Sequence, residues 1–274
     1  MQIAQLKISE QPFIVMGILN LTPDSFSDGG LYLDPTTAVA RAQQMIEEGA
    51  DIIDIGGEST RPGAQPLTAG EEISRVVPVI SALRAVSDIP ISIDSSKPEV
   101  MAAAVKAGAN LINDVRALQE KGALEMAASL DVPVCLMHMQ GQPRSMQNKP
   151  EYKNVVDDVS LFLQQRIALC QQAGIDQQQI MIDPGFGFGK NLDHNLSLLK
   201  HLSEFVKMGF PVLVGTSRKS MLGQIANAEI DQRLAAGLAT TILGYQSGAR
   251  IFRVHDVKAT VDALKVCYAV ETAE

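Results

Sequence analysis

Residues 13–20 read Phe13-Ile14-Val15-Met16-Gly17-Ile18-Leu19-Asn20, a run of apolar side chains that ends on a polar amide. Continuous apolar runs of this length are typical of parallel strands buried on both faces. The next ten residues, 21–30, are rich in Pro, Gly, Ser and Asp, a composition that ends a strand and favours a polar loop. The stretch therefore predicts a buried strand that delivers Asn20 to the edge of a functional site.

The same pattern of a short apolar run followed by a helical segment recurs along the chain. The other runs are residues 51–55, 89–93, 110–112, 132–137, 180–182, 211–214 and 250–254. Helix-start signals such as Asp34-Pro35 and Lys97-Pro98 precede the amphipathic segments between them. About eight alternations of strand and helix favour an α/β fold of the (β/α)8 TIM-barrel type. An open doubly wound sheet is the alternative, but no glycine-rich dinucleotide motif follows the first strand.

No charge run, low-complexity tract or proline-rich linker divides the 274 residues, so a single domain over 1–274 is expected. Residues 1–12 precede the first strand and are expected to form a small lid or hairpin beneath the barrel. Mobile loops are expected at about residues 21–33 and 57–68, where Gly, Ser and Pro gather.

The composition excludes several classes of function. A net charge of −8 and a pI near 5.1 argue against nonspecific binding of nucleic acid, because no overall positive field attracts phosphates. The three cysteines, Cys135, Cys170 and Cys267, are widely spaced and indicate neither a disulfide framework nor a zinc site. No signal peptide and no apolar stretch of about 18 residues is present, so a cytoplasmic protein without a membrane partner is expected.

Polar residues close the predicted strands, and in TIM barrels the chemistry lies at the carboxyl ends of the strands. They are Asn20, Asp54, Glu58, Asp94, Asn113, Asp114, His138, Asp183, Ser217, Arg218, Lys219, Arg253 and His255. Any one of them could cap a helix, close a turn or hydrogen-bond in the core. The convergence of the whole set on one rim predicts a binding site.

Four of these residues suit a flat heterocycle with amino and carbonyl edges: Asp94, Asn113, Asp183 and Lys219. A 2-amino-4-oxo pyrimidine ring donates hydrogen bonds to carboxylates and accepts one from a lysine. The segment 183–189 also contains a Gly-x-Gly-x-Gly pattern, which indicates a flexible turn more than a phosphate cradle.

A second group combines the neutral oxygen of Asn20 with two donors, Arg253 and His255. This combination suits a phosphate or pyrophosphate with Mg²⁺, which keeps most of its waters and takes few protein ligands. The structural alternative for residues 253–256 is the end of a strand followed by an Asp256 helix cap, and both interpretations are compatible.

In all these segments the chain closely resembles the dihydropteroate synthases, the bacterial folate-pathway enzymes that sulfonamides inhibit. The first match covers residues 16–30, Met-Gly-Ile-Leu-Asn-Leu-Thr-Pro-Asp-Ser-Phe-Ser-Asp-Gly-Gly, and the second covers 54–63, Asp-Ile-Gly-Gly-Glu-Ser-Thr-Arg-Pro-Gly. Further matches are residues 93–95, 112–115, 136–139, 183–190, 215–220 and 253–256. The resemblance spans nearly the whole predicted barrel.

The resemblance implies a transferase that condenses 6-hydroxymethyl-7,8-dihydropterin pyrophosphate with p-aminobenzoate to give 7,8-dihydropteroate and pyrophosphate. It implies Mg²⁺ as cofactor, loss of pyrophosphate before attack by the arylamine, and sulfonamides as competitive inhibitors. Because residues 61–64 lack the inserted aromatic residue of resistant relatives, the chain is expected to be sensitive. It also implies a homodimer, for which the apolar faces of residues 234–245 and 257–270 are candidates.

The resemblance also assigns roles to residues. The catalytic residues are Asp94, Lys219, Arg253 and His255. The pterin residues are Asp94, Asn113, Met137, Asp183, Phe188, Gly215, Lys219 and Arg253, and those for pyrophosphate are Asn20, Thr60, Arg61, Arg253 and His255. The p-aminobenzoate residues are Phe26, Thr60, Pro62, Phe188, Lys219 and Ser220, and Asn20 is the metal ligand.

Three other functions fit parts of this pattern. A corrinoid-dependent methyltransferase shares the pterin cradle but needs no pyrophosphate site. A noncatalytic pterin-binding barrel would keep Asp183 and Lys219 without the loop residues. A Schiff-base aldolase would use Lys219, whose pKa the neighbouring Arg218 could lower.

Overall fold

The computed structural model describes residues 1–22, 34–59, 65–141 and 146–274, and within them the main sheet is a parallel barrel. Its strands are β3 (Ile14–Asn20), β4 (Ile52–Gly56), β5 (Ile91–Asp94), β6 (Leu111–Asp114), β7 (Val134–Met137), β8 (Ile180–Asp183), β9 (Leu213–Val214) and β10 (Ile251–Val254). The strand order is β8-β7-β6-β5-β4-β3-β10-β9, and a parallel bridge between Ile182 and Val212 joins the two ends. The predicted TIM barrel is confirmed, and each predicted strand overlaps an observed one.

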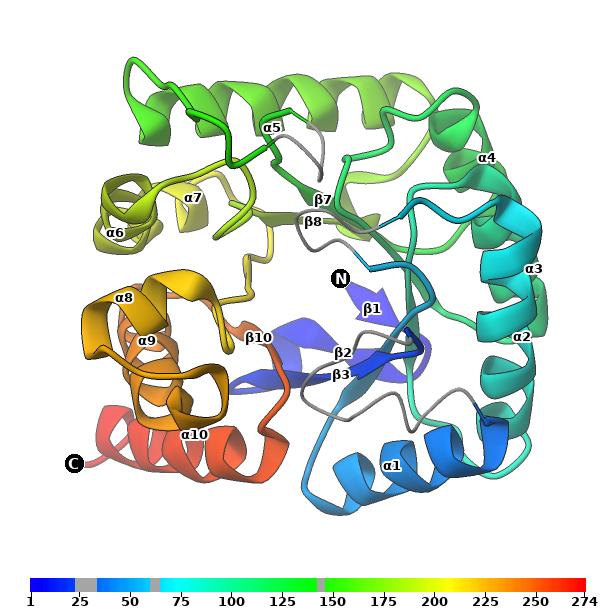
Figure 1. Ribbon diagram of the computed structural model, residues 1–274, viewed down its shortest axis with the longest axis horizontal. Helices are drawn as coiled ribbons and strands as arrows, with labels where there is room; N and C mark the ends of the chain where they lie inside the picture. The colour runs from blue at the N-terminus through cyan, green and yellow to red at the C-terminus, as the bar shows by residue number, and fades with distance from the viewer. Residues whose placement is uncertain (23–33, 60–64, 142–145) are drawn as a thin grey trace.

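The helices surround the strands as a ring (Figure 1). They are α1 (Pro35–Glu47), α2 (Ala69–Arg84), α3 (Pro98–Ala107), α4 (Ala123–Leu130), α5 (Val155–Gln172), α6 (Leu192–Lys200), α7 (Leu202–Val206), α8 (Ser220–Ala226), α9 (Leu234–Gln246) and α10 (Val257–Glu271). The expected start signals act in α1, where Asp34 accepts a hydrogen bond from the Thr37 amide at 3.1 Å and Pro35 opens the helix. At the end of α3, Gly108 adopts a φ of 120°.

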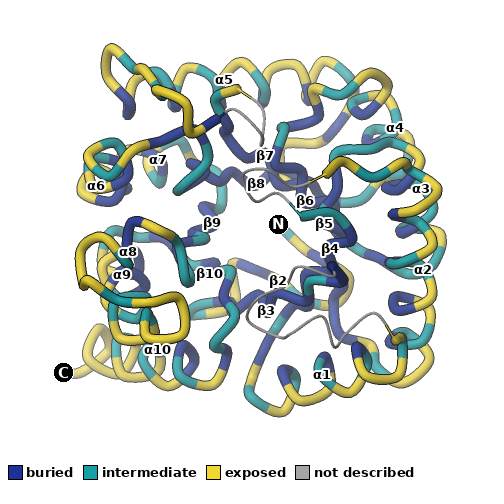
Figure 2. The backbone as a smooth tube through the Cα atoms, in the orientation of Figure 1, coloured by how far each residue is buried: buried dark blue, intermediate teal, exposed yellow. Residues whose placement is uncertain are grey.

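Each strand is buried on both faces because its side chains alternate between the barrel interior and the helices. In β10, Ile251 belongs to the interior cluster, whereas Phe252 and Val254 pack in the cluster shared with the helices. The barrel strands are accordingly mostly dark blue in Figure 2, and much of the exposed, yellow surface lies on the outer faces of the helices. This alternation gives the strands their continuous apolar runs.

The N-terminal residues close the end of the barrel at which the strands begin, called the lower end below. Strands β1 (Gln2–Ile3) and β2 (Leu6–Lys7) form an antiparallel hairpin, followed by a short 3-10 helix at Ile8–Glu10. Ile3 and Ile8 pack against the lowest interior side chains of the strands. The hairpin expected beneath the barrel is therefore present.

Among the described residues, no helix is both long enough and apolar enough to cross a membrane. The cytoplasmic location stays a prediction. Of the loops expected at 21–33 and 57–68, residues 23–33 and 60–64 lie outside the described residues.

Candidate active site at the carboxyl ends of the strands

The interior of the barrel changes from apolar to polar towards the carboxyl ends of the strands. The lowest layer is apolar and consists of Ile14, Met16, Ile52, Leu111, Cys135, Met181, Leu213 and Ile251. Two residues further along four of these strands, at positions that face the same side, stand Asp54, Asn113, Asp183 and Arg253. Because every second residue of a strand faces the barrel interior, these polar residues form the layer next to the packed apolar layer.

Arg253 connects two carboxylates, that of Asp54 in this layer and that of Asp94 at the end of β5. Its Nε donates to Asp54 Oδ2 at 2.6 Å, and its Nη2 donates to Asp94 Oδ2 at 2.8 Å. Burial alone would lower the pKa of Arg253, but the two carboxylates outweigh it and raise the pKa, so the guanidinium is charged. Burial raises the pKa of Asp94, and the charge of Arg253 opposes this shift.

Asn113 lies beside the same network, deep in the barrel. Its Nδ2 lies 3.4 Å from both carboxylate oxygens of Asp54, and its side chain is almost fully buried. Asp54 itself has 0% exposed surface and is not among the residues that line the pocket described below. The sequence placed Asp54 among the strand-end residues of the site, but its pairing with Arg253 was not predicted.

A second cluster joins Asp183, Lys219 and Phe188. Lys219 Nζ donates to the carbonyl of Phe186 and lies 4.1 Å from the centre of the Phe188 ring. Burial lowers the pKa of Lys219 to about 8, and the nearby Asp183 carboxylate opposes the shift. Asp183 Oδ1 accepts the Gly185 amide at 2.7 Å, and burial raises the pKa of this carboxyl.

His255 is oriented by Ser217, a contact that sequence analysis did not anticipate. Ser217 Oγ lies 3.0 Å from His255 Nδ1 and accepts the His255 amide N–H at 3.2 Å. The neighbouring Arg218 donates to both carboxylate oxygens of Asp256, at 3.2 and 2.6 Å. Asp256 occupies the N-cap position of α10 without a side-chain capping bond, so its carboxylate pairs with Arg218 instead of capping the helix.

Members of both predicted groups line one pocket of about 590 Å³. Its lining includes Asn20, Asp94, Phe188, Lys219, Ser220, Arg253 and His255. Asn113, Met137 and Asp183 lie deeper and are nearly buried, and Met137 packs with Met146 and Phe188. A Cβ at Gly215 would lie 3.9 Å from Asp183 Oδ2, which places Gly215 beside that carboxylate.

Four of the predicted ligand-binding residues, Phe26, Thr60, Arg61 and Pro62, lie outside the described residues. Two other strand-end residues serve the fold. Asp114 accepts the amides of Arg116 and Leu118 at 2.8 and 2.7 Å and so closes the turn after β6. His138 contacts the buried Lys190, with Nδ1 2.8 Å from the lysine Nζ.

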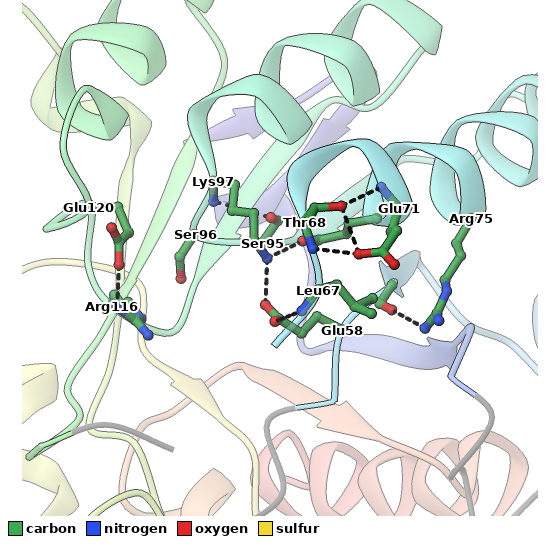
Figure 3. A network of polar contacts seen from close by, with 12 residues as sticks. Glu58, Leu67, Thr68, Glu71, Arg75, Ser95, Ser96, Lys97, Arg116 and Glu120 are labelled. Carbon is green, nitrogen blue, oxygen red and sulfur yellow. Dashed lines mark hydrogen bonds and ion pairs between the residues drawn. The ribbon is translucent and has the colours of Figure 1, made fainter. Parts of the chain in front are cut away.

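An ion-pair network borders the pocket at the end of β4 (Figure 3). Lys97 Nζ lies 2.6 Å from a carboxylate oxygen of both Glu58 and the buried Glu72. Glu58 Oε1 accepts the Leu67 amide at 2.8 Å. The network ties the segments after β4 and β5 to each other, and the contributions of Lys97 and Glu72 were not predicted.

Within the part of the chain that the structure describes, no cluster of three or more His, Cys, Asp or Glu residues could hold a metal ion. Asn20 is half-buried at the end of β3 and lines the pocket together with Arg253 and His255. Such a site fits a metal ion that is carried mainly by the oxygens of a bound pyrophosphate and takes one neutral protein oxygen.

Comparisons with known proteins agree with this geometry. The family profile described as pterin binding enzyme matches residues 16–255. The dihydropteroate synthase of Escherichia coli strain K12 is 52% identical over 260 residues, which cover 95% of this chain and 92% of that protein.

Two solved structures are similar over nearly their whole length. The Yersinia pestis dihydropteroate synthase in complex with a sulfonamide drug has a TM-score of 0.95 and 51% identity, covering 98% of this chain and 97% of that one. The Xanthomonas albilineans dihydropteroate synthase in complex with 7,8-dihydropteroate has a TM-score of 0.88 and 47% identity, with coverage of 98% and 97%.

Proposed function

This chain belongs to the dihydropteroate synthases within the pterin-binding enzyme family. From that membership we propose how the pocket at the carboxyl ends of the strands performs the reaction of this family. The enzyme condenses 6-hydroxymethyl-7,8-dihydropterin pyrophosphate with p-aminobenzoate, releasing pyrophosphate. The observation that carries the residue roles is the single pocket in which Asp94, Lys219, Arg253 and His255 meet.

The pterin ring occupies the deep part of this pocket. Asp183 and Asn113 present a carboxylate and an amide to the amino and ring N–H edge of the heterocycle. Lys219 donates to the carbonyl or an unprotonated ring nitrogen, and Met137 and Phe188 cover the ring faces. Gly215 leaves room beside Asp183, since it carries no side chain there.

The difficult step is the departure of pyrophosphate from the methylene carbon, because the arylamine of p-aminobenzoate is already neutral and needs no strong base. Arg253 and His255 stabilise the negative charge that develops on the leaving group. Asp94 faces the positive charge left on the pterin methylene, and its pairing with Arg253 holds it at the pocket wall. The nitrogen of the arylamine then bonds to this carbon in place of the departed pyrophosphate oxygen, and one proton passes from the nitrogen to solvent.

Asn20 is the protein ligand that we propose for Mg²⁺. When bound, the ion neutralises part of the pyrophosphate charge. The support is the position of Asn20 in the pocket lining with Arg253 and His255, where the oxygens of bound pyrophosphate would supply further ligands.

Phe188, Lys219 and Ser220 form the described part of the p-aminobenzoate site. All three line the pocket, and Ser220 is exposed at its rim as the first residue of α8. The remaining residues proposed for this substrate, Phe26, Thr60 and Pro62, complete the site in our proposal. The residues proposed for pyrophosphate include Thr60 and Arg61.

A coupled assay tests the function together with the residue roles. Purified protein is expected to release pyrophosphate only when dihydropterin pyrophosphate, p-aminobenzoate and Mg²⁺ are all present. The variants Asp94→Ala and Lys219→Ala are expected to fold, by circular dichroism and thermal melting, and to lose most turnover. Unfolding of both variants would assign these residues to the fold instead, and pyrophosphate release without Mg²⁺ would refute the metal proposal.

We also propose an order of substrate binding. Because bound pyrophosphate completes the second site in our proposal, p-aminobenzoate is expected to bind detectably only when the pterin and pyrophosphate sites are filled. Calorimetry with the empty enzyme and with the enzyme preloaded with a pterin and pyrophosphate tests this order. Equal affinity in both experiments would exclude it.

The competing functions are less consistent with these findings. Similarity to dihydropteroate synthases over 95% of the chain favours the synthase over a methyltransferase or a noncatalytic barrel. For Lys219, its contacts with the Phe186 carbonyl and the Phe188 ring favour a hydrogen-bonding role over a Schiff base. Borohydride trapping with a carbonyl substrate is expected to leave Lys219 unmodified.

Sulfonamide inhibition and a homodimer remain further proposals. The Yersinia pestis relative binds a sulfonamide drug, and competition with p-aminobenzoate in the coupled assay tests sensitivity. The dimer is supported by exposed apolar side chains on α9 and α10, where Leu243, Val266 and Val270 are 50%, 65% and 72% exposed. Light scattering of the wild type and of Val266→Asp distinguishes a dimer from a monomer.

A further inference from the structure

Lys190 is a buried lysine that the proposed reaction does not use. Lys190 comes directly after the glycine-rich turn that follows β8, and the residue is 3% exposed. Its Nζ donates to the carbonyls of Gly185 at 2.9 Å, Phe188 at 3.0 Å and His138 at 3.3 Å, and it lies 2.8 Å from His138 Nδ1. Lysine is rarely buried without partners, so this set of acceptors explains how the fold tolerates it.

The turn that Lys190 holds is packed tightly against the end of β7. Gly185, Gly187 and Gly189 all have positive φ, at 73°, 79° and 62°. An added Cβ at Gly185 would lie 1.9 Å from the His138 carbonyl oxygen, and one at Gly189 would lie 2.5 Å from that of Gln140. The glycines therefore permit a close backbone approach that no larger residue allows.

Polar side chains fix the rest of the turn. The Gly187 amide donates to Asn195 Oδ1 at 2.7 Å, and Tyr152 Oη donates to the Gly189 carbonyl at 2.8 Å. On the pocket side, Lys219 Nζ donates to the Phe186 carbonyl, and its Cδ would lie 2.8 Å from a Cβ at Gly187. Two lysines thus bind carbonyls of the same turn, one from the buried side and one from the pocket side.

We propose that Lys190 is a positioning residue for the synthase reaction. By fixing the backbone of the turn, Lys190 positions the Phe188 ring and the Phe186 carbonyl. The Phe186 carbonyl in turn orients Lys219. The Phe188 carbonyl is bonded to Lys190, while the Phe188 side chain lines the pocket beside Lys219. Loss of the buried lysine nitrogen would leave the Gly185 and Phe188 carbonyls without this donor, and the turn would relax. Lys190 touches no substrate in this scheme.

Steady-state kinetics of Lys190→Met test the inference. We expect the KM for p-aminobenzoate to rise about tenfold, because a shift of the Phe188 ring by a fraction of an ångström misplaces its contact. A purely structural role would lower the amount of active enzyme, and hence the apparent kcat, without changing this KM. The matched control is Lys207→Met, because this lysine is exposed on the surface and its ammonium pairs with Glu204.

The inference rests on the proposed contact between p-aminobenzoate and Phe188, which Phe188→Ala tests by itself. If Phe188→Ala leaves the KM for p-aminobenzoate unchanged, the proposed contact is wrong. If Phe188→Ala raises this KM but Lys190→Met does not, the role of Lys190 is wrong. In the double variant, the Lys190 substitution is expected to add little, since both act through the same ring, and full additivity would contradict the inference.

Lys190→Gln keeps the test valid if the methionine variant does not fold. The glutamine amide retains two donors for the buried carbonyls, so a smaller rise in the same KM is expected. A Lys190→Gln variant with a lowered melting temperature and the wild-type KM for p-aminobenzoate would restrict Lys190 to stabilising the fold.

Discussion

Arg253 donates from Nε to Asp54 Oδ2 at 2.6 Å, and Asp54 is completely buried beneath the pocket. The guanidinium at the pocket wall is thus oriented by a carboxylate that cannot reach a ligand. This contact lies within the polar layer of the barrel and orients the group that we propose stabilises pyrophosphate.

Asp54→Asn is expected to weaken both stability and catalysis. The neutral amide no longer balances the buried charge of Arg253, and breaking such a pair costs about 3 kcal/mol. We also expect kcat to fall, because Arg253 loses its orientation relative to Asp94. Urea unfolding and steady-state assays measure the two effects. The control Asp262→Asn removes a surface pair with Lys258 and should change the free energy of unfolding by less than about 0.5 kcal/mol. An equal loss of unfolding free energy in both variants would argue against the buried contact.

The activity is expected to decline as the pH rises through the pKa of Lys219. Burial lowers this pKa to about 8, and only the ammonium form donates to an acceptor on the pterin. The kcat/KM for dihydropterin pyrophosphate should therefore fall above about pH 8. Lys219→Arg should lack this decline because its guanidinium stays charged, and the same decline in that variant would assign it to another group.

The free energy of unfolding should rise with pH through the ionisation of Lys219, whereas the activity falls. The pKa of Lys219 is lower in the folded protein than the ordinary value of 10.5, so the unfolded chain binds this proton more strongly between pH 8 and 10.5. The free energy of unfolding of the wild type, relative to Lys219→Met, should rise with pH over that window. Urea unfolding at a series of pH values measures the difference, and a fall over the window would contradict the assignment.

Ser217→Ala is expected to weaken the binding of pyrophosphate. Its hydroxyl contacts both Nδ1 and the amide of His255, so its loss frees the imidazole to rotate. One such hydrogen bond is worth about 1 kcal/mol, which corresponds to about a fivefold rise in the inhibition constant of pyrophosphate. Ser247→Ala, which removes a helix-end hydroxyl bonded to Leu243, is the control. An unchanged inhibition constant in Ser217→Ala would show that Ser217 does not orient His255.

Gly187→Ala is expected to disturb Lys219 in addition to straining the backbone. Its φ of 79° costs an alanine about 1 kcal/mol, and the new Cβ would lie 2.8 Å from Lys219 Cδ. Gly209→Ala has nearly the same φ, 81°, but meets no atom within 4 Å. The difference between the two variants isolates the contact with Lys219. We expect both to melt at lower temperature and only Gly187→Ala to lose activity.

Much of the fold and of the site was predictable because it follows from local periodicity. The apolar run 13–19 became β3, and Asn20 stands at its end beside Arg253 and His255 in the same pocket. Asp94, Lys219, Arg253 and His255 meet as expected, since parallel strands in a barrel bring their carboxyl ends to one rim. The motif matches added the reaction, which residue types alone could not specify.

The contacts between supporting residues were not predictable from the sequence. Ser217 and His255 are 38 positions apart, and Lys190 and His138 are 52 apart. His138 and Asp114 looked like site residues because they also close strands, but their side chains bond to a buried lysine and to turn amides. Asp256 likewise had the position of a helix cap but pairs with Arg218.

The sequence by itself therefore determined the strands, their helices and the set of polar groups delivered to one end of the barrel, because alternation and turn composition act over a few residues. The tertiary structure alone decided which of these groups are buried and which face the pocket. It also decided that Asp54 orients Arg253 and that Lys190 holds the turn of Phe188. Such pairings depend on the register between distant strands and on packing that excludes water, and neither is expressed in a local pattern of residues.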